Sequence, residues 1–160
     1  MYYRILGTAA LALSFMAGTA IAQASYMDED FYLNNYCKTT TWNDETTSKS
    51  PNIGDCQELV REFYEHKKKG VRLNPPWKYG DKETPYLKIK NFGSCTFGVR
   101  VVDTDNDNPA PLAGKDMGDI VNDAIDMFGH DGKIGASGVV PCAPKWMSDK
   151  NHHIAWKIYV

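Results

Sequence analysis

The sequence lacks a strong excess of charge of either sign and lacks the cysteine spacings of metal sites. Its 18 lysines and arginines and 20 aspartates and glutamates leave a formal net charge of −2, which argues against a dedicated nucleic-acid binder. The four cysteines contain no Cys-x-x-Cys pair, so zinc and redox motifs are not indicated. After residue 22 no apolar run reaches the ~20 residues that a membrane-spanning helix needs. We therefore expect no metal, no cofactor, no nucleic-acid partner and no stable membrane insertion.

The one long apolar run is at the N-terminus. Residues 5–21 carry no charge, and Ala20, Ala22 and Ala24 place small residues at alternate positions at its end. This layout predicts a secretory signal peptide over residues 1–22, with cleavage after Ala22 or Ala24. A membrane anchor is the alternative, but glycine, serine and threonine dilute the run and acidic residues follow it. The mature protein is therefore expected to be secreted and extracellular.

Secretion determines how the cysteines are interpreted. In an oxidising route an even number of widely spaced cysteines predicts two disulfides and no free thiol. What remains after cleavage has the size of one domain. Residues 25–35 show no periodicity and are expected to form a flexible arm, and residues 36–160 are expected to form a single domain. The four cysteines are Cys37, Cys56, Cys95 and Cys142.

Strand and helix patterns alternate along this domain. Asp55, with Glu58 at capping-box spacing, is expected to begin a helix that lysines and Gly70 end. Asp116 is expected to cap a second helix that ends before Gly129. Alternating apolar residues predict strands. The predicted strands are 36–42, 86–90, 96–102, 134–142 and 154–160, and the predicted loops include 43–54 and 71–85.

The predicted order is β-α-β-β-α-β plus a C-terminal strand. Such elements pack best as an α+β domain of the split βαβ kind, an antiparallel sheet with two helices packed on one face. In that fold the first strand starts at the edge where the fourth ends, which brings Cys37 near Cys142. The first helix starts at the edge where the third strand starts, which brings Cys56 near Cys95. The expected disulfides are therefore Cys37 with Cys142 and Cys56 with Cys95.

A search for catalytic groups finds no convincing set. A secreted fungal-type ribonuclease would need a histidine and a glutamate on one sheet face. His152 and His153, at the edge of the last strand, are not expected to share a face with Glu58 or Glu62. Ser137 lacks the Gly-x-Ser-x-Gly frame of a nucleophile elbow. No catalytic residue is predicted.

The best candidates for an exposed contact surface lie in the loop 74–80. Trp77, Lys78 and Tyr79 stand between two prolines and a glycine. Aromatic side chains in such a loop provide a large contact area at a small entropic cost, so they make good binding anchors. The alternative is that they cover the edge of the core.

Several linked motifs follow one another along the domain. In order, they are Ser50-Pro51, Asp55-Cys56-Gln57-x-Leu59, Gly93-Ser94-Cys95-Thr96-Phe97-Gly98-Val99, Gly114-x-Asp116-x-x-Asp119-Ile120 and Gly132-x-Ile134-x-x-x-Gly138-x-x-x-Cys142. Together they resemble the necrosis-inducing factor family of small secreted fungal effectors, named after an extracellular effector of the tomato leaf-mould fungus. The resemblance covers residues 37–142. It implies an apoplastic virulence factor that triggers necrosis or a resistance response in plants, with kinship to killer toxins and no catalytic residues.

Three hypotheses follow. The first is a non-enzymatic secreted effector that binds a host plant protein or surface component. The alternative is a killer-toxin-like antimicrobial protein that acts on competing microbes, although the mild acidity of the chain argues against direct membrane lysis. The third, a small secreted hydrolase, is disfavoured by the search for catalytic motifs.

Overall fold

The computed structural model describes residues 23–27, 37–66, 70–74, 85–103, 110–143 and 152–160. The helices are α1 (Ile53–Glu65) and α2 (Gly114–Phe128). The strands are β1 (Gln23–Met27), β2 (Asn43–Asp44), β3 (Gly70–Asn74), β4 (Leu87–Phe92), β5 (Cys95–Asp103), β6 (Ala110–Ala113), β7 (Ala136–Cys142) and β8 (His152–Tyr159).

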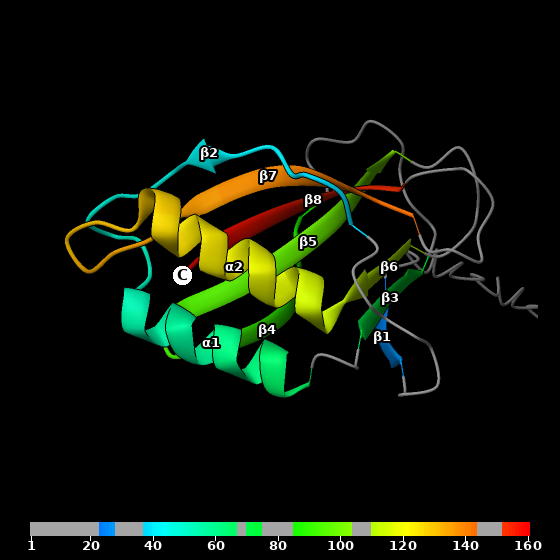
Figure 1. Ribbon diagram of the computed structural model, residues 1–160, viewed down its shortest axis with the longest axis horizontal. Helices are drawn as coiled ribbons and strands as arrows, with labels where there is room; N and C mark the ends of the chain where they lie inside the picture. Colours follow the sequence, from blue (N-terminus) through cyan, green and yellow to red (C-terminus); the bar gives the residue numbers. More distant parts are fainter. Residues whose placement is uncertain (1–22, 28–36, 67–69, 75–84, 104–109, 144–151) are drawn as a thin grey trace, which may run out of the picture.

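Within these residues the strands form two antiparallel sheets. The larger has the order β2-β7-β8-β5-β4 and the smaller has the order β1-β3-β6. Both helices lie over the same face of the larger sheet, and the smaller sheet lies at the end of the molecule where α2 begins (Figure 1). The predicted α+β class is confirmed. A single sheet was expected, and the structure corrects this expectation by adding the second one.

The core lies between the helices and the larger sheet. Ile154, Trp156 and Ile158 alternate along β8 and are almost completely buried, as the period of two in a strand requires. From the other side α1 contributes Phe63, whose ring meets Phe97 of β5 edge to face at 5.7 Å. Burial of each such side chain stabilises the fold by roughly 1.5–3 kcal/mol.

The last strand lies at the centre of the larger sheet. The predicted order put the first and fourth strands together and left the position of the C-terminal strand open. In the structure β8 lies between β7 and β5. β8 carries Trp156, which is 0% exposed, and its central position gives it an antiparallel partner strand on each side.

The predicted first strand, 36–42, is wrong in its bounds. This segment follows β7 through hydrogen bonds from Lys38 N to Pro141 O and from Thr41 N to Val139 O, both 2.9 Å. Pro141 has no N–H group, so the ladder cannot continue opposite Lys38. The regular pairing is limited to β2, inside the predicted loop 43–54.

The whole of the smaller sheet was missed. Residues 25–27 belong to β1, although a flexible arm was expected there, and the rest of that arm lies outside the described residues. β3 lies in the predicted loop 71–85, although buried Val71 and Leu73 flank exposed Arg72 in the alternation of a strand. β6 contains a proline, which is tolerated because β6 is an edge strand.

Both predicted helix starts are also corrected. α1 begins at Ile53 with Asn52 as its N-cap, and no side chain caps it. The expected capping residue, Asp55, instead accepts hydrogen bonds from Ser94 N (2.8 Å) and Ser94 Oγ (2.6 Å). α2 begins at Gly114, so Asp116 lies inside its first turn and not at its cap.

Two disulfides hold these layers together. They join Cys37 with Cys142 and Cys56 with Cys95, which is the pairing expected from the sequence. The bonded cysteines are 105 and 39 residues apart. In the chain-entropy account, closing loops of these lengths stabilises the fold by at most about 5 and about 4 kcal/mol.

Candidate binding cleft

A cleft of about 300 Å³ opens between the segment 37–42, helix α2 and strand β7. We call it the acidic cleft, because three aspartates of α2 contribute to its lining. Its lining includes Asp116 and Asp119, which belong to the motifs of the family resemblance, and Cys37, which is bonded to Cys142. The lining residues are Cys37, Lys38, Thr39, Thr40, Trp42, Asp116, Asp119, Ile120, Asp123 and Val140.

One wall is held rigidly against β7. The Cys37–Cys142 disulfide anchors its first residue. Further along, Trp156 Nε1 donates a 2.7 Å hydrogen bond to Thr40 Oγ1, and Val139 N donates a 2.9 Å bond to Thr41 Oγ1. Because a covalent bond and side-chain hydrogen bonds both hold the wall, the cleft is formed before any ligand arrives.

Trp42 lines the cleft and is partly exposed. Its ring meets Trp156 edge to face at 5.3 Å and Phe128 at 6.4 Å. This packing restrains the ring and leaves part of its surface in the cleft. A restrained aromatic surface provides contact area to a ligand at little entropic cost.

The wall can lie so close to β7 because residue 138 is glycine. A Cβ atom on Gly138 would be 1.9 Å from Thr41 O and 2.7 Å from the nearest atom of the Trp156 ring. Any larger residue would therefore push the segment away from the sheet. This steric requirement gives Gly138, one of the motif residues, a structural role.

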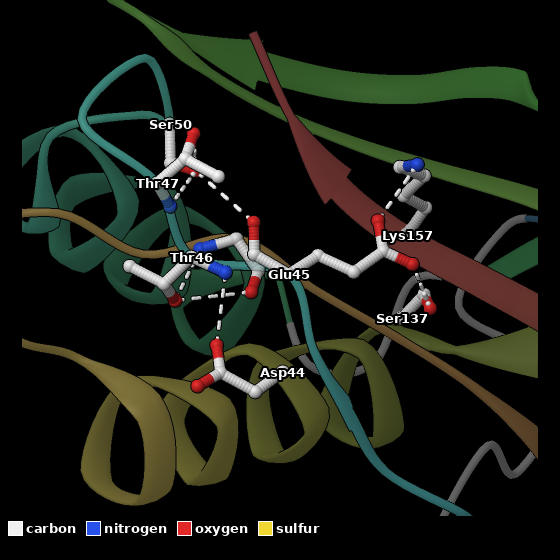
Figure 2. A network of polar contacts seen from close by, with 8 residues as sticks. Asp44, Glu45, Thr46, Thr47, Ser50, Ser137 and Lys157 are labelled. Carbon is white, nitrogen blue, oxygen red and sulfur yellow. Dashed lines mark hydrogen bonds and ion pairs between the residues drawn. The ribbon is translucent and has the colours of Figure 1, made fainter.

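Beyond the cleft, a network of polar contacts holds residues 44–50 (Figure 2). Glu45 accepts a 2.5 Å hydrogen bond from Ser137 Oγ and pairs with Lys157 Nζ at 2.8 Å. Partial burial works to raise the pKa of Glu45, but the hydrogen bonds from Lys157 and Ser137 outweigh it and hold the pKa below its usual value. Thr46 Oγ1 donates to the backbone oxygens of Phe128 and Gly135. This network continues the anchoring of the wall.

The opposite wall is the acidic side of α2. Asp119 accepts hydrogen bonds from Tyr64 Oη (2.9 Å) and from Lys115 Nζ (2.7 Å), so its carboxylate is held by α1 as well as by its own helix. Burial and the hydrogen bond to Asp119 raise the pKa of Tyr64 to about 12, so the phenol keeps its proton in all ordinary buffers. Asp116 is 6% exposed and lies deeper in the wall.

Asp123, one of the three aspartates that line the cleft, has a pKa that is raised above its usual value. Partial burial raises its pKa, and the negative charges of Asp119 and Asp126 raise it further. A ligand that brings a positive charge or hydrogen-bond donors to this place would relieve that repulsion. The lining therefore combines apolar side chains, threonine hydroxyls and carboxylates with one lysine, Lys38.

Of the site residues predicted from the sequence, Cys37 lines the cleft. Trp77, Lys78 and Tyr79 lie outside the described residues, so their role stays a prediction. His152, for which no catalytic role was predicted from the sequence, is buried on β8.

Sequence reasoning missed the acidic cleft. The available signal was the spacing of aspartates at positions i, i+3 and i+7 of α2, which places them on one side of a helix. That spacing belongs to Asp116, Asp119 and Asp123.

Among the described residues, no group of three or more histidine, cysteine, aspartate or glutamate side chains is placed to hold a metal ion. In the same part of the chain, no helix is both long and apolar enough to cross a membrane.

Comparisons with known proteins place the chain in a family. A family model described as "Pathogen effector; putative necrosis-inducing factor" matches residues 36–142. Two proteins of Penicillium expansum are similar in sequence: "Probable chitinase LysM18" is 30% identical over 124 residues (77% of this chain, 8% of that protein), and "Secreted chitinase LysM12" is 28% identical over 145 residues (86% and 9%). The chain thus spans less than a tenth of the length of these relatives. A secreted relative and two disulfides agree with an extracellular protein. The chain belongs to the pathogen-effector family that this model describes.

Proposed function

We propose that the protein is a secreted effector that acts by binding a component of a host plant, without catalysing a reaction, and that the acidic cleft is its binding surface. Binding in the plant apoplast would then induce necrosis or a resistance response. The host component is a protein or a surface component of the plant cell.

The observation that carries this proposal is the preformed cleft. One wall is tied to β7 by a disulfide, and the other is tied to α1 by the bond from Tyr64 to Asp119. Two walls that are already in place lose little entropy when a ligand binds. In addition, Asp116 and Asp119 belong to the motifs by which the chain resembles its family, and both line the cleft.

A pair of charge reversals on α2 tests the proposal. Asp123 lines the cleft, whereas Asp126 lies on the same helix, is also exposed, and is outside the lining. Infiltration of pure folded protein into leaves should show that Asp123→Lys lowers the response at least tenfold at a given dose. We expect Asp126→Lys to lower the response far less than Asp123→Lys, because Asp126 lies outside the lining and acts on the cleft only through its solvent-screened charge.

The melting temperatures of both variants serve as the folding control. Exposed helix positions tolerate such changes within about 0.5 kcal/mol. If Asp123→Lys stays folded and keeps the full response, the cleft is not the binding surface. If neither the wild-type protein nor either variant provokes a response in a range of plants, the host-directed function itself is wrong.

The alternative function is a killer-toxin-like action on competing microbes. The names of the two relatives favour it, because a chitinase acts on chitin, a polymer of fungal cell walls. Growth-inhibition assays on fungi and bacteria, run with the same protein as the leaf assay, separate the two functions. Inhibition of microbes together with silent leaves would establish the alternative.

A further inference from the structure

We infer that the mature protein begins at Gln23 and that this residue is cyclised to pyroglutamate, an uncharged N-terminus. The inference is independent of the proposed function. It starts from β1, whose first described residue is Gln23. The sequence alone leaves cleavage after Ala22 or after Ala24 open, since both alanines end a small-x-small pattern.

The pairing of β1 distinguishes the two cleavage positions. All five residues of β1 have partners in β3, from Gln23 opposite Asn74 to Met27 opposite Gly70. Cleavage after Ala22 keeps all five pairs. Cleavage after Ala24 removes the two residues opposite Asn74 and Leu73 and leaves a strand of three residues, which is at the short end of what sheets contain.

The two lost pairs are structurally important because β3 is the central strand of its sheet. Leu73 pairs with Ala24 on one side and with Ala110 of β6 on the other, and its side chain is 1% exposed. Without Ala24, the backbone of a buried residue loses its partner strand on one side, which is unfavourable for peptide groups near a core. The pairing of β1 therefore favours cleavage after Ala22 over cleavage after Ala24.

An N-terminal glutamine has a specific chemistry. Its α-amino nitrogen attacks the side-chain carboxamide carbon Cδ, so that a new N–Cδ bond closes a five-membered lactam. The bond from Cδ to Nε2 breaks, and Nε2 leaves as ammonia with the proton that the amine gives up. No oxidant, reductant or further reactant is needed.

The product suits the position of Gln23. Cyclisation removes the positive charge of the α-amine, and the backbone carbonyl of residue 23 remains available to the strand. Peptidases that remove residues from a free α-amine cannot act on the lactam. The modification therefore protects β1 at its first residue.

The test is the mass of the intact protein, secreted as the full chain from a eukaryotic host and measured freshly purified without digestion. The expected mass is that of residues 23–160 with two disulfides, lower by about 17 Da for the lost ammonia. Sequential N-terminal degradation should be blocked until pyroglutamyl aminopeptidase is added, and should then read Ala24-Ser25-Tyr26.

Gln23→Ala is the matched control. It keeps the small residues before the cut, and an N-terminal alanine cannot cyclise. Its mass should correspond to cleavage after Ala22 with no loss of ammonia, and its N-terminus should be open to degradation. A wild-type protein that begins at Ser25, that retains residues before Gln23, or that begins at Gln23 with its ammonia retained overturns the inference.

Discussion

Substitution of Gly138 by alanine is expected to destabilise the protein strongly. The new Cβ would be 1.9 Å from Thr41 O, so this carbonyl must move by on the order of 1 Å to restore a normal contact. Such a movement breaks the bonds from Thr41 N to Val139 O, from Val139 N to Thr41 Oγ1 and from Trp156 Nε1 to Thr40 Oγ1. At about 1 kcal/mol for each hydrogen bond, the free energy of unfolding falls by about 3 kcal/mol.

Differential scanning calorimetry and urea unfolding measure this loss. For a chain of this size, about 3 kcal/mol corresponds to a fall in Tm of roughly 10 °C. Gly54→Ala is the matched control, because Gly54 lies in α1 with no atom within 4 Å of the added Cβ. Alanine in a helix should raise the stability there by about 0.5–1 kcal/mol. If Gly138→Ala melts within about 2 °C of the wild type, the steric account of the wall is wrong.

Three further predictions concern other parts of the molecule. Hydrogen bonds from Ser94 hold the pKa of Asp55 below its ordinary value of 3.8. The ionised Asp55 therefore stabilises the fold above about pH 3.8, and this stabilisation is lost as the pH falls through the lower pKa of the folded state. Urea unfolding from pH 6 to about pH 2 should show the stability of the wild type approaching that of Asp55→Asn at the acid end. Alkylation without reductant should label no cysteine in the folded protein, and Cys56→Ser should lose about 2–5 kcal/mol of stability together with activity; labelled cysteines in folded wild-type protein would contradict this. If the loop 74–80 is a contact surface, Trp77→Ala with Tyr79→Ala should weaken the plant response while Tm barely changes, whereas a lower Tm with a response in proportion to the folded fraction would make the loop structural.

The elements that could be predicted from the sequence are those in which apolar residues recur at a regular spacing. Helix α2 and strand β8 both carry long apolar patterns of the right spacing, and both appear in the structure close to their predicted ranges. The hairpin of β4 and β5 was also predicted, because alternating residues flank a turn at Gly93, where φ is +50°. In these places one local pattern is enough to specify the element.

The errors arose where partners distant in sequence decide the structure. The backbone of 37–42 is irregular because Pro141, which lies opposite Lys38 but more than a hundred residues later in the chain, lacks an N–H group. Asp55 has the spacing of a helix cap, yet its carboxylate binds the turn at Ser94. No pattern within a short window contains either partner, so reasoning from periodicity could not find them.

The motifs that carry the family resemblance divide into two structural groups. Asp55, Gly93 and Ser94 surround the Cys56–Cys95 disulfide, and a Cβ on Gly93 would be 2.5 Å from the carboxylate of Asp55. These residues join α1 to the hairpin of β4 and β5, so they stabilise the fold and do not line the cleft. Asp116 and Asp119 instead line the acidic cleft. Of this second group Asp119 is itself engaged with Tyr64, so under the proposed function Asp123 is the carboxylate of the cleft that we expect to meet a ligand.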